Sequence, residues 1–350
     1  MLKTTVDLGA VARESGLSRT TVSYILSGKH QQVKISPATA QRVMKVADKL
    51  GYRSNFWARS LVRKKSQLIG VLFPDITGSA AQQITEGIHE VLTQNNYETI
   101  LAVSFWKREE ERRQVELMLE KRVEGIVALP QAGSEETFQM VKNAGCPLVF
   151  ICDWLPGVAA SSVTLDVDDA MNKVLYHLHQ LGRKLIHLLS VDYGSKTLQD
   201  REAAFKKGLA SLGLPVGPDS ISYTELARDI SVYEKARQLV ERSDRPEAVV
   251  CISDAVAVLT LSELARLRIK VPDELAVASI GNLQLTDHPF FALTTVDECR
   301  KEIGRQAVNL MFKRINGGSG GPEHIRIKGP LITRSSTVGG SRFDLMPGNI

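Results

Sequence analysis

The first fifty residues of the chain carry apolar positions at the three- and four-residue spacing of helices. The clearest series is Ala40, Val43, Ala47 and Leu50. Ser36 suits the N-cap of a helix over this series, Pro37 suits its first position, and Gly51 suits the residue just past its end. The pattern therefore predicts a helix over residues 37–50, whose apolar face packs on the segment before it.

Two shorter helices are expected in that preceding segment. An apolar-faced helix ends near Glu14, Gly16 sits in a tight turn, and Ser18 is placed to cap a second helix with hydroxyl and basic side chains. Two helices joined by a short turn that contains Gly make a helix-turn-helix, whose second helix can enter the major groove of DNA. The residues expected in its core are Val11, Ala12 and Val22.

From Leu68 onward the pattern changes to continuous apolar runs, which are typical of strands buried on both faces. The runs lie at residues 68–73, 99–103, 125–129, 148–151, 185–190, 248–252 and 275–280. Helices are expected at residues 80–94, 109–121, 135–143, 170–181, 200–212, 232–241 and 255–267. This alternation predicts an α/β fold with two doubly wound parallel sheets. Ligands of such folds bind beyond the carboxyl ends of the strands, here in a cleft between two lobes.

Charge separates the same two regions. Through Lys65 the chain has thirteen basic and three acidic residues, a net charge of +10. The remainder has 31 basic and 36 acidic residues, a net charge of −5. A basic arm on a mildly acidic body favours contact with a polyanion, and such binding should weaken steeply with salt. The alternative, a basic face that is merely solvated, is disfavoured by the helix-turn-helix pattern.

Bulk composition is ordinary for a soluble globular protein, with 43% hydrophobic and 24% charged residues over a length of 350. The four cysteines lack Cys-x-x-Cys spacing, which predicts reduced thiols and no disulfide framework. The amino terminus lacks the apolar run of a signal peptide, and no stretch approaches the roughly 18 apolar residues of a membrane span. We expect a cytoplasmic protein on the nucleoid, without a membrane partner.

Short motifs also follow one another in a fixed order along nearly the whole chain. Those of the arm are Leu17-Ser18-Arg19-Thr20-Thr21-Val22-Ser23, Leu50-Gly51-Tyr52 and Ala58-Arg59-Ser60-Leu61. Those of the body are Leu68-Ile69-Gly70-Val71, Lys121-Arg122-Val123-Glu124-Gly125-Ile126, Val271-Pro272-Asp273-Glu274-Leu275-Ala276-Val277 and Leu293-Thr294-Thr295-Val296. Together they resemble the LacI/GalR family of transcription regulators, and the arm is most similar to the branch of the catabolite repressor/activator and sucrose repressors. The resemblance implies a repressor that binds a pseudo-palindromic double-stranded DNA operator as a homodimer, under control of a small-molecule effector.

The resemblance also implies a division of the chain. Residues 1–54 would form the DNA-binding headpiece, 55–67 a hinge helix and linker, 68–340 the effector-binding and dimerisation core, and 341–350 a tail. Within the core, the N-lobe would hold residues 68–165 and 296–325, and the C-lobe residues 166–295 and 326–340. The tail lacks a leucine heptad, which favours a dimer over a coiled-coil tetramer.

Residues for DNA contact are carried over from the resemblance. Arg19, Thr20 and Tyr24 stand at the base-reading positions of the recognition helix. A guanidinium can hold O6 and N7 of guanine with two hydrogen bonds, although a phosphate contact is the alternative for Arg19. The residues expected to contact the DNA backbone are Ser18, Thr21, Ser23, Lys34, Tyr52 and Asn55.

Ala58 and Leu61 match the hinge-helix positions that enter the minor groove in the family. An apolar wedge there unstacks a base step and bends the duplex. Two hinges that meet at a symmetric operator imply a homodimer. The neighbouring Trp57 either packs hinge against hinge or covers the headpiece.

Six candidate effector residues follow from matching positions: Asp75, Trp154, Thr197, Arg201, Ser253 and Glu298. Arg201 is the best supported of them, and an arginine there suits hydroxyls, carboxylates or phosphates. The alternative for Arg201 is a structural bridge between helix and lobe. The positions that differ from sugar-binding relatives are Ser253-Asp254, Gly281-Asn282 and Ala227, and Ala80 and Ala81 replace the aromatic pair of purine-binding relatives. They favour a sugar phosphate or sugar acid over a neutral sugar.

Motifs of enzymes are missing from the sequence. No Gly-x-Gly-x-x-Gly follows the first strand, and neither a Walker loop nor a nucleophile elbow occurs. His177 and His179 lie on different faces of an expected helix without a third metal ligand. We therefore expect no catalytic activity, no cofactor and no metal. Two alternatives remain: an extracytoplasmic solute-binding protein, which would need a signal peptide, and an enzyme fused to a helix-turn-helix, which would need a catalytic cluster in the cleft.

Overall fold

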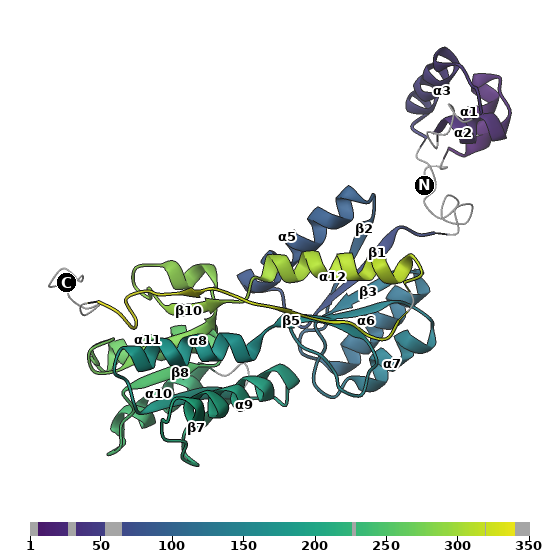
Figure 1. Ribbon diagram of the computed structural model, residues 1–350. Coiled ribbons are helices and arrows are strands. Elements are labelled where there is room, and N and C mark those ends of the chain that lie inside the picture. Colours follow the sequence, from purple (N-terminus) through teal and green to yellow (C-terminus); the bar gives the residue numbers. More distant parts are fainter. Residues whose placement is uncertain (1–5, 27–32, 53–64, 226–228, 319, 340–350) are drawn as a thin grey trace. The chain divides into compact units, whose positions relative to one another are not determined.

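The computed structural model describes residues 6–26, 33–52, 65–225, 229–318 and 320–339 (Figure 1). The chain forms two compact units, Met1–Ser66 and Gln67–Ile350, which we describe separately. In the described ranges no helix combines the length and the apolar character needed to cross a membrane.

The first unit contains helices α1 (Leu8–Ser15), α2 (Arg19–Leu26) and α3 (Pro37–Leu50). Both predicted caps of α3 are confirmed. The hydroxyl of Ser36 accepts a hydrogen bond from the Thr39 amide at 3.2 Å, and Gly51 adopts the left-handed conformation at φ 65° that ends the helix. The buried side chains that join the three helices are Val11, Ala12, Val22, Ile25, Ala40, Val43 and Ala47.

The second unit contains two six-stranded sheets. The first has the order β11-β5-β4-β3-β1-β2, with every pair parallel. Its strands are β1 (Leu68–Phe73), β2 (Glu98–Val103), β3 (Gly125–Ala128), β4 (Leu148–Ile151), β5 (Ser161–Leu165) and β11 (His324–Ile327). Its helices are α5 (Ser79–Gln94), α6 (Arg108–Glu120), α7 (Glu135–Asn143) and α12 (Arg300–Ile315).

Alternating side chains of β1 show how helices cover both faces of this sheet. Ile69, Val71 and Phe73 pack in one cluster with α5 and α12, whereas Leu72 packs on the opposite face with α6 and α7. Helices α5 and α12 approach closely because Gly87 lacks a side chain: a Cβ there would lie 2.0 Å from the carbonyl oxygen of Lys301. Figure 1 shows these two helices side by side over the sheet.

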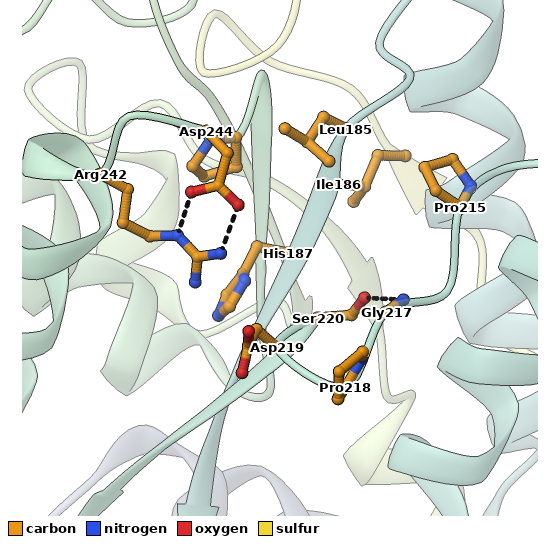
Figure 2. A pocket seen from close by; sticks show the side chains of 11 residues that line it. Leu185, Ile186, His187, Pro215, Gly217, Pro218, Asp219, Ser220, Arg242 and Asp244 are labelled. Atoms are coloured by element: carbon orange, nitrogen blue, oxygen red, sulfur yellow. Dashed lines mark hydrogen bonds and ion pairs between the residues drawn. The ribbon is translucent and has the colours of Figure 1, made fainter.

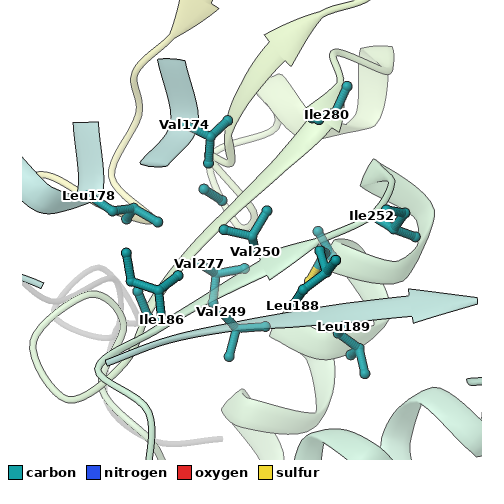
Figure 3. Packing of buried hydrophobic residues seen from close by; sticks show 14 of the residues in the cluster. Val174, Leu178, Ile186, Leu188, Leu189, Val249, Val250, Ile252, Val277 and Ile280 are labelled. Carbon is teal, nitrogen blue, oxygen red and sulfur yellow. The ribbon is translucent and has the colours of Figure 1, made fainter. Parts of the chain in front are cut away.

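The second sheet has the order β12-β10-β9-β8-β6-β7, and only its edge pair β10–β12 is antiparallel. Its strands are β6 (Ile186–Asp192), β7 (Ile221–Glu225), β8 (Ala248–Cys251), β9 (Ala276–Gly281), β10 (Thr294–Asp297) and β12 (Leu331–Ile332). Around it lie α8 (Val167–Gln180), α9 (Lys196–Ser211), α10 (Asp229–Glu241), α11 (Asp254–Arg266) and the short 3₁₀-helix η1 (Gln284–Asp287). Figure 3 shows Val174 and Leu178 of α8 above Ile186, Val250 and Val277 of three neighbouring strands.

The predicted α/β class with two parallel-dominated sheets is confirmed, and each predicted run overlaps an observed strand. The structure adds the short strands β5, β7, β10, β11 and β12. Strands β5 and β10 are largely buried but carry Ser and Thr, and β7 and β11 are in part exposed, so none of these four gives a continuous apolar run. The chain passes between the two sheets after β5, between β10 and α12, and between β11 and β12. The carboxyl ends of parallel strands from both lobes are the expected edge for a ligand site.

Candidate DNA-binding surface and effector cleft

The turn between α1 and α2 is built by its end residues. The Asp7 carboxylate accepts a hydrogen bond from the Ala10 amide at 2.7 Å and starts α1. Gly16, at φ 68°, turns the chain so that its own amide bonds back to the carbonyls of Ala12 and Arg13. This places Ser18 directly before α2.

Ser18 caps α2 as predicted. Its Oγ accepts a hydrogen bond from the Thr21 amide at 3.1 Å and lies 2.8 Å from the Thr21 hydroxyl. The amides of a first helical turn have no partner inside the helix, so the amino end of α2 is a place where an anion such as a phosphate can bind. The roles of Ser18 and Thr21 at the DNA backbone remain predictions.

One face of α2 is buried and the other is polar and exposed. Val22 and Ile25 pack into the core of the first unit. The exposed residues of the same helix are Arg19, Thr20, Ser23 and Tyr24. The outward face thus consists of a guanidinium, two hydroxyls and a phenol, which are groups that hydrogen-bond to base edges and phosphates.

Arg19 is only loosely held by its own protein. Its Nη2 lies 3.9 Å from an Asp7 carboxylate oxygen, and the two side chains are 69% and 64% exposed. An ion pair of this kind contributes little stability, so the guanidinium can exchange Asp7 for DNA. Lys34 is exposed and Tyr52 half-buried. The remaining predicted residues of this region, Asn55, Trp57, Ala58 and Leu61, lie outside the described residues.

The cleft residues gather where the strands of both sheets end. Asp153 follows β4 of the first sheet, and its Oδ2 accepts a hydrogen bond from the Ser195 hydroxyl at 2.5 Å. Its Oδ1 accepts the Thr197 amide at 2.9 Å, while the Thr197 hydroxyl donates to the carbonyl of Cys152 at 2.9 Å. A carboxylate of one lobe therefore caps the first turn of α9 in the other.

Aromatic side chains line the same junction. The Lys196 ammonium lies 5.5 Å from the centroid of the predicted site residue Trp154. Trp106, which follows β2, meets Tyr193, which follows β6, edge to face at a centroid distance of 5.2 Å. The sequence did not indicate that these rings meet, because Trp106 and Tyr193 lie in loops that carry no motif.

Arg201 and Glu298 meet in a buried ionic cluster with Arg300. Arg201 Nη1 donates to the carbonyl of Ile252 at 2.7 Å, and its Nη2 donates to Glu298 Oε1. Arg300 Nη1 donates to the carbonyl of Gly281 at 2.6 Å, and its Nη2 lies 2.6 Å from Glu298 Oε2. Burial would raise the pKa of Glu298, but the charges of Arg300 and Arg201 outweigh burial and hold that pKa below its usual value.

The other predicted cleft residues, Asp75 and Ser253, are not part of this hydrogen-bonded cluster. Asp75 follows β1, and its carboxylate accepts two hydrogen bonds from Thr77, both at 2.8 Å. Ser253 precedes α11, and within the described ranges its side chain makes no capping hydrogen bond. Of the six predicted residues, the structure thus joins Arg201 to Glu298 directly, and brings Thr197 and Trp154 together around Asp153 and Lys196.

Sequence reasoning missed Asp153, Ser195 and Arg300, and it named Asp254 only as a difference from sugar-binding relatives. Asp254 is 1% exposed and accepts hydrogen bonds from the Leu283 amide at 2.6 Å and from the hydroxyls of Ser279 and Thr295. Burial raises the pKa of Asp254. The available signal was position: a polar residue directly after a buried strand stands at the ligand-binding edge.

Glu111 is a second buried carboxyl, on α6 of the first lobe. Its Oε1 accepts the Gln131 amide at 3.1 Å, and its Oε2 has no hydrogen-bond partner among the described residues. Burial raises the pKa of Glu111 to about 7, although Ser134 and Gln131 act in the opposite direction. Glu111 therefore changes its charge near neutral pH.

A separate hollow of about 180 Å³ opens at the amino ends of β6 and β7, the edge opposite to the cluster of Arg201 (Figure 2). Arg242 donates two hydrogen bonds to Asp244 at 2.9 and 2.7 Å. Burial, aided by the charge of Arg242, lowers the pKa of His187 to about 4, so this ring is uncharged at neutral pH. With Asp219 also in its wall, the hollow offers no excess positive charge to an acidic ligand.

Comparison with known proteins agrees with both units. The model of bacterial regulatory proteins of the lacI family matches residues 8–55, and a periplasmic binding protein-like domain matches residues 175–337. Catabolite control protein A of Staphylococcus epidermidis is 30% identical over 312 residues, which cover 89% of this chain and 93% of that protein. The HTH-type transcriptional repressor PurR of Vibrio parahaemolyticus is 28% identical over 307 residues, covering 87% and 90%. The crystal structure of the lac repressor dimer bound to operator and the anti-inducer ONPF has a TM-score of 0.85 at 21% identity, covering 96% of this chain and 100% of that one.

A helix-turn-helix headpiece and a two-lobed binding-protein-like core in one chain define the class of DNA-binding transcription regulators with a ligand-binding domain. The structure joins an exposed recognition face to a core whose candidate site lies between its lobes. The chain belongs to the lacI family of bacterial regulatory proteins. In the described part of the chain, no group of three His, Cys, Asp or Glu side chains is arranged to hold a metal ion.

Proposed function

We propose that the chain represses transcription by binding a pseudo-palindromic operator as a homodimer, with its DNA affinity set by a small molecule between the lobes. The exposed polar face of α2 over a closed apolar core is the observation that carries this proposal. The similar lac repressor structure is a dimer on its operator, which supports the same arrangement here. A monomer would present a single recognition helix, whereas a palindrome offers two half-sites.

The division of labour along the chain follows from this proposal. Residues 1–54 read DNA, 55–67 form the hinge, 68–340 bind effector and partner subunit, and 341–350 form the tail. Arg19, Thr20 and Tyr24 contact bases, and Leu61 with Ala58 enters the minor groove. The residues proposed for the DNA backbone are Ser18, Thr21, Ser23, Lys34, Tyr52 and Asn55.

The effector is proposed to be a sugar, a sugar phosphate or a sugar acid that binds at the carboxyl ends of the core strands. Its proposed contacts are Asp75, Trp154, Thr197, Arg201, Ser253 and Glu298. Asp153 and Thr197 hydrogen-bond across the lobes, so a change of lobe angle breaks or forms that contact. Effector can shift the populations of two lobe arrangements only through different affinities for them.

No catalytic activity and no cofactor are part of this proposal, since the similar curated proteins bear the names of transcription regulators. We place the protein in the cytoplasm, on the nucleoid, because an operator-binding protein must reach the chromosome.

Selection of bound duplexes from a random pool by the full chain tests the proposal. The expected product is a site with two related half-sites, and a footprint should cover both. Leu61→Ala should then weaken binding to that site far more than binding to random DNA. The control is Leu185→Ala, which changes an exposed leucine of the effector-binding core and should weaken binding neither to the selected site nor to random DNA. Equal loss on both DNAs in the Leu61→Ala protein would remove the hinge from the proposal.

A further inference from the structure

Arg201 and Arg300 converge on one carboxylate in the interlobe cluster, and we call these two residues the arginine clamp. Each guanidinium uses Nη1 for a backbone carbonyl and Nη2 for one oxygen of Glu298. The side chains of Arg201, Arg300 and Glu298 are 7%, 9% and 11% exposed. Two fixed guanidiniums that share the two oxygens of one carboxylate have the geometry of an anion site.

Glu298 is the counter-ion of this site. Across the described ranges, no other carboxylate lies within 4.0 Å of either guanidinium. Asp153 and Asp254 stand nearby, but their oxygens are held by hydroxyls and backbone amides. Arg201 Nε is buried without a hydrogen-bond partner among the described residues, which leaves one unused donor in the clamp.

Glu298 also occupies a special place along the chain. It lies in the connection between β10, which belongs to the second sheet, and α12, which packs on the first. Arg300 is the first residue of α12, while Arg201 belongs to α9 of the second lobe. The carboxylate therefore links both lobes at a point where the chain crosses between them.

We propose that the arginine clamp is the effector's anion site, that Glu298 fills it as an internal ligand, and that the effector is a sugar acid whose carboxylate takes the place of Glu298. This inference rests on the proposed effector cleft and names the chemistry of its ligand. A neutral sugar cannot replace Glu298, because two buried guanidiniums would lose their counter-ion.

A carboxylate matches the clamp better than a phosphate does. The carboxylate of Glu298 is planar and offers one oxygen to each guanidinium. A sugar carboxylate reproduces this planar pair and the single negative charge. A phosphate monoester is tetrahedral and carries more than one negative charge near neutral pH. Exchange of Glu298 for ligand also releases the crossover between the lobes, which couples binding to lobe angle.

Acetate provides a direct probe of the clamp. Its methyl carbon and carboxylate correspond to the Cγ and carboxylate that the Glu298→Ala substitution removes. With ionic strength matched by sodium chloride, acetate should raise the melting temperature of full-length Glu298→Ala by about 2–4 °C over the neutral isostere acetamide. The matched control is Glu90→Ala, since Glu90 also pairs with two cations, Lys301 and Arg305, but is 39% exposed. Wild type and Glu90→Ala should respond equally to the two compounds. If the difference in melting temperature between acetate and acetamide were the same in all three proteins, the proposal that the arginine clamp is an anion site would be overturned.

Glu298→Gln keeps the shape of the side chain, so the test holds even where Glu298→Ala fails to fold. Because glutamine is a neutral competitor, acetate should bind this variant at least about tenfold more tightly than it binds wild type in a calorimetric titration. Unchanged acetate affinity would contradict an internally occupied anion site.

Wild-type protein on its selected operator identifies the ligand class. Gluconate, glucuronate and galacturonate are compared with glucose, galactose and their 6-phosphates. At least one of the acids should change the operator dissociation constant about tenfold or more. A response to neutral sugars or sugar phosphates alone, or no response to any compound of the panel, overturns the proposal that the effector is a sugar acid. Failure of the proposed function itself would be visible earlier, as loss of operator binding without any added ligand.

Discussion

The two candidate sites of this protein differ in the solvent exposure of their side chains. On α2 of the headpiece, the Arg19 side chain is 69% exposed and forms a long ion pair with Asp7 of its own protein. In the cleft, Arg201 is 7% exposed and is bound by Glu298 and a backbone carbonyl. The guanidinium of Arg19 is thus accessible to an external partner, whereas the guanidinium of Arg201 is already bound within the protein.

This difference has an energetic consequence. Groups on the headpiece surface exchange water for DNA, so their removal changes binding and leaves the fold intact. Groups in the cleft are desolvated and paired, so removal of one leaves another buried and unpaired. Stability and DNA affinity should therefore respond to different mutations, and four predictions follow from that separation.

The largest effect on the free energy of unfolding is expected for Arg201→Met, which leaves the buried Glu298 carboxylate with a single guanidinium. Breaking a buried ion pair costs roughly 3–5 kcal/mol of unfolding free energy. Denaturant unfolding of the core measures it. Arg112→Met is the control, because Arg112 is 58% exposed in its pair with Glu116, and should cost about 0–1 kcal/mol. Similar losses in both proteins would show that burial does not set the cost of removing an arginine from an ion pair.

Glu111→Gln should remove a pH dependence of stability. The folded-state pKa of Glu111 is about 7 against an ordinary 4.5, so the folded protein holds this proton between those values. Wild-type stability should then fall as the pH rises from about 4.5 to 7, by roughly 2–3 kcal/mol relative to the variant.

The neighbouring Glu110 supplies the control for that pH series. The hydrogen bond from Arg113 lowers the pKa of Glu110 to about 2, so its contribution is lost only as the pH falls below ordinary carboxylate values. Glu110→Gln should leave the slope between pH 5 and 7 as in wild type. If Glu111→Gln did the same, Glu111 would not titrate near neutrality.

Arg19→Ala should weaken binding to the selected operator by about 1–3 kcal/mol without a change in melting temperature. The reason is the loss of a base contact from a side chain that contributes little to the fold. Fluorescence anisotropy with operator and random duplex measures both affinities. Equal weakening on the two DNAs would reassign Arg19 to the phosphate backbone.

Ser18 and Ser36 form a matched pair that separates capping from DNA contact. Both hydroxyls accept the amide three residues ahead, at 3.1 and 3.2 Å. Alanine at either position should cost about 1 kcal/mol of headpiece stability, whereas Asp preserves the cap. Ser18→Asp should still weaken DNA binding, because its charge would face phosphates, and Ser36→Asp should not. Equal DNA binding by the two Asp variants would remove Ser18 from the interface.

The headpiece could be predicted from sequence because its signals are local. The caps at Ser18 and Ser36 and the left-handed Gly16 and Gly51 each act within a few residues, and the structure has all four. The strands of the core interior were predicted for a related reason, since burial on both faces leaves a continuous apolar run.

The cleft could be predicted only in part, because its contacts join residues far apart in sequence. Glu298 and Arg201 are separated by 97 positions, and Asp153 and Thr197 by 44. Arg300 is the first residue of α12, and no sequence motif marks it as the second guanidinium on Glu298. Edge strands such as β7 and β11 were missed because their side chains are only partly buried.

The most direct test of the account is the ratio of affinities for the selected operator and a scrambled duplex, measured with the full chain at one moderate salt concentration. A family member that reads sequence through α2 and the hinge should prefer its operator by about a thousandfold or more. Equal affinity for the two duplexes would show a basic arm that binds DNA without reading it, and would contradict the proposed function.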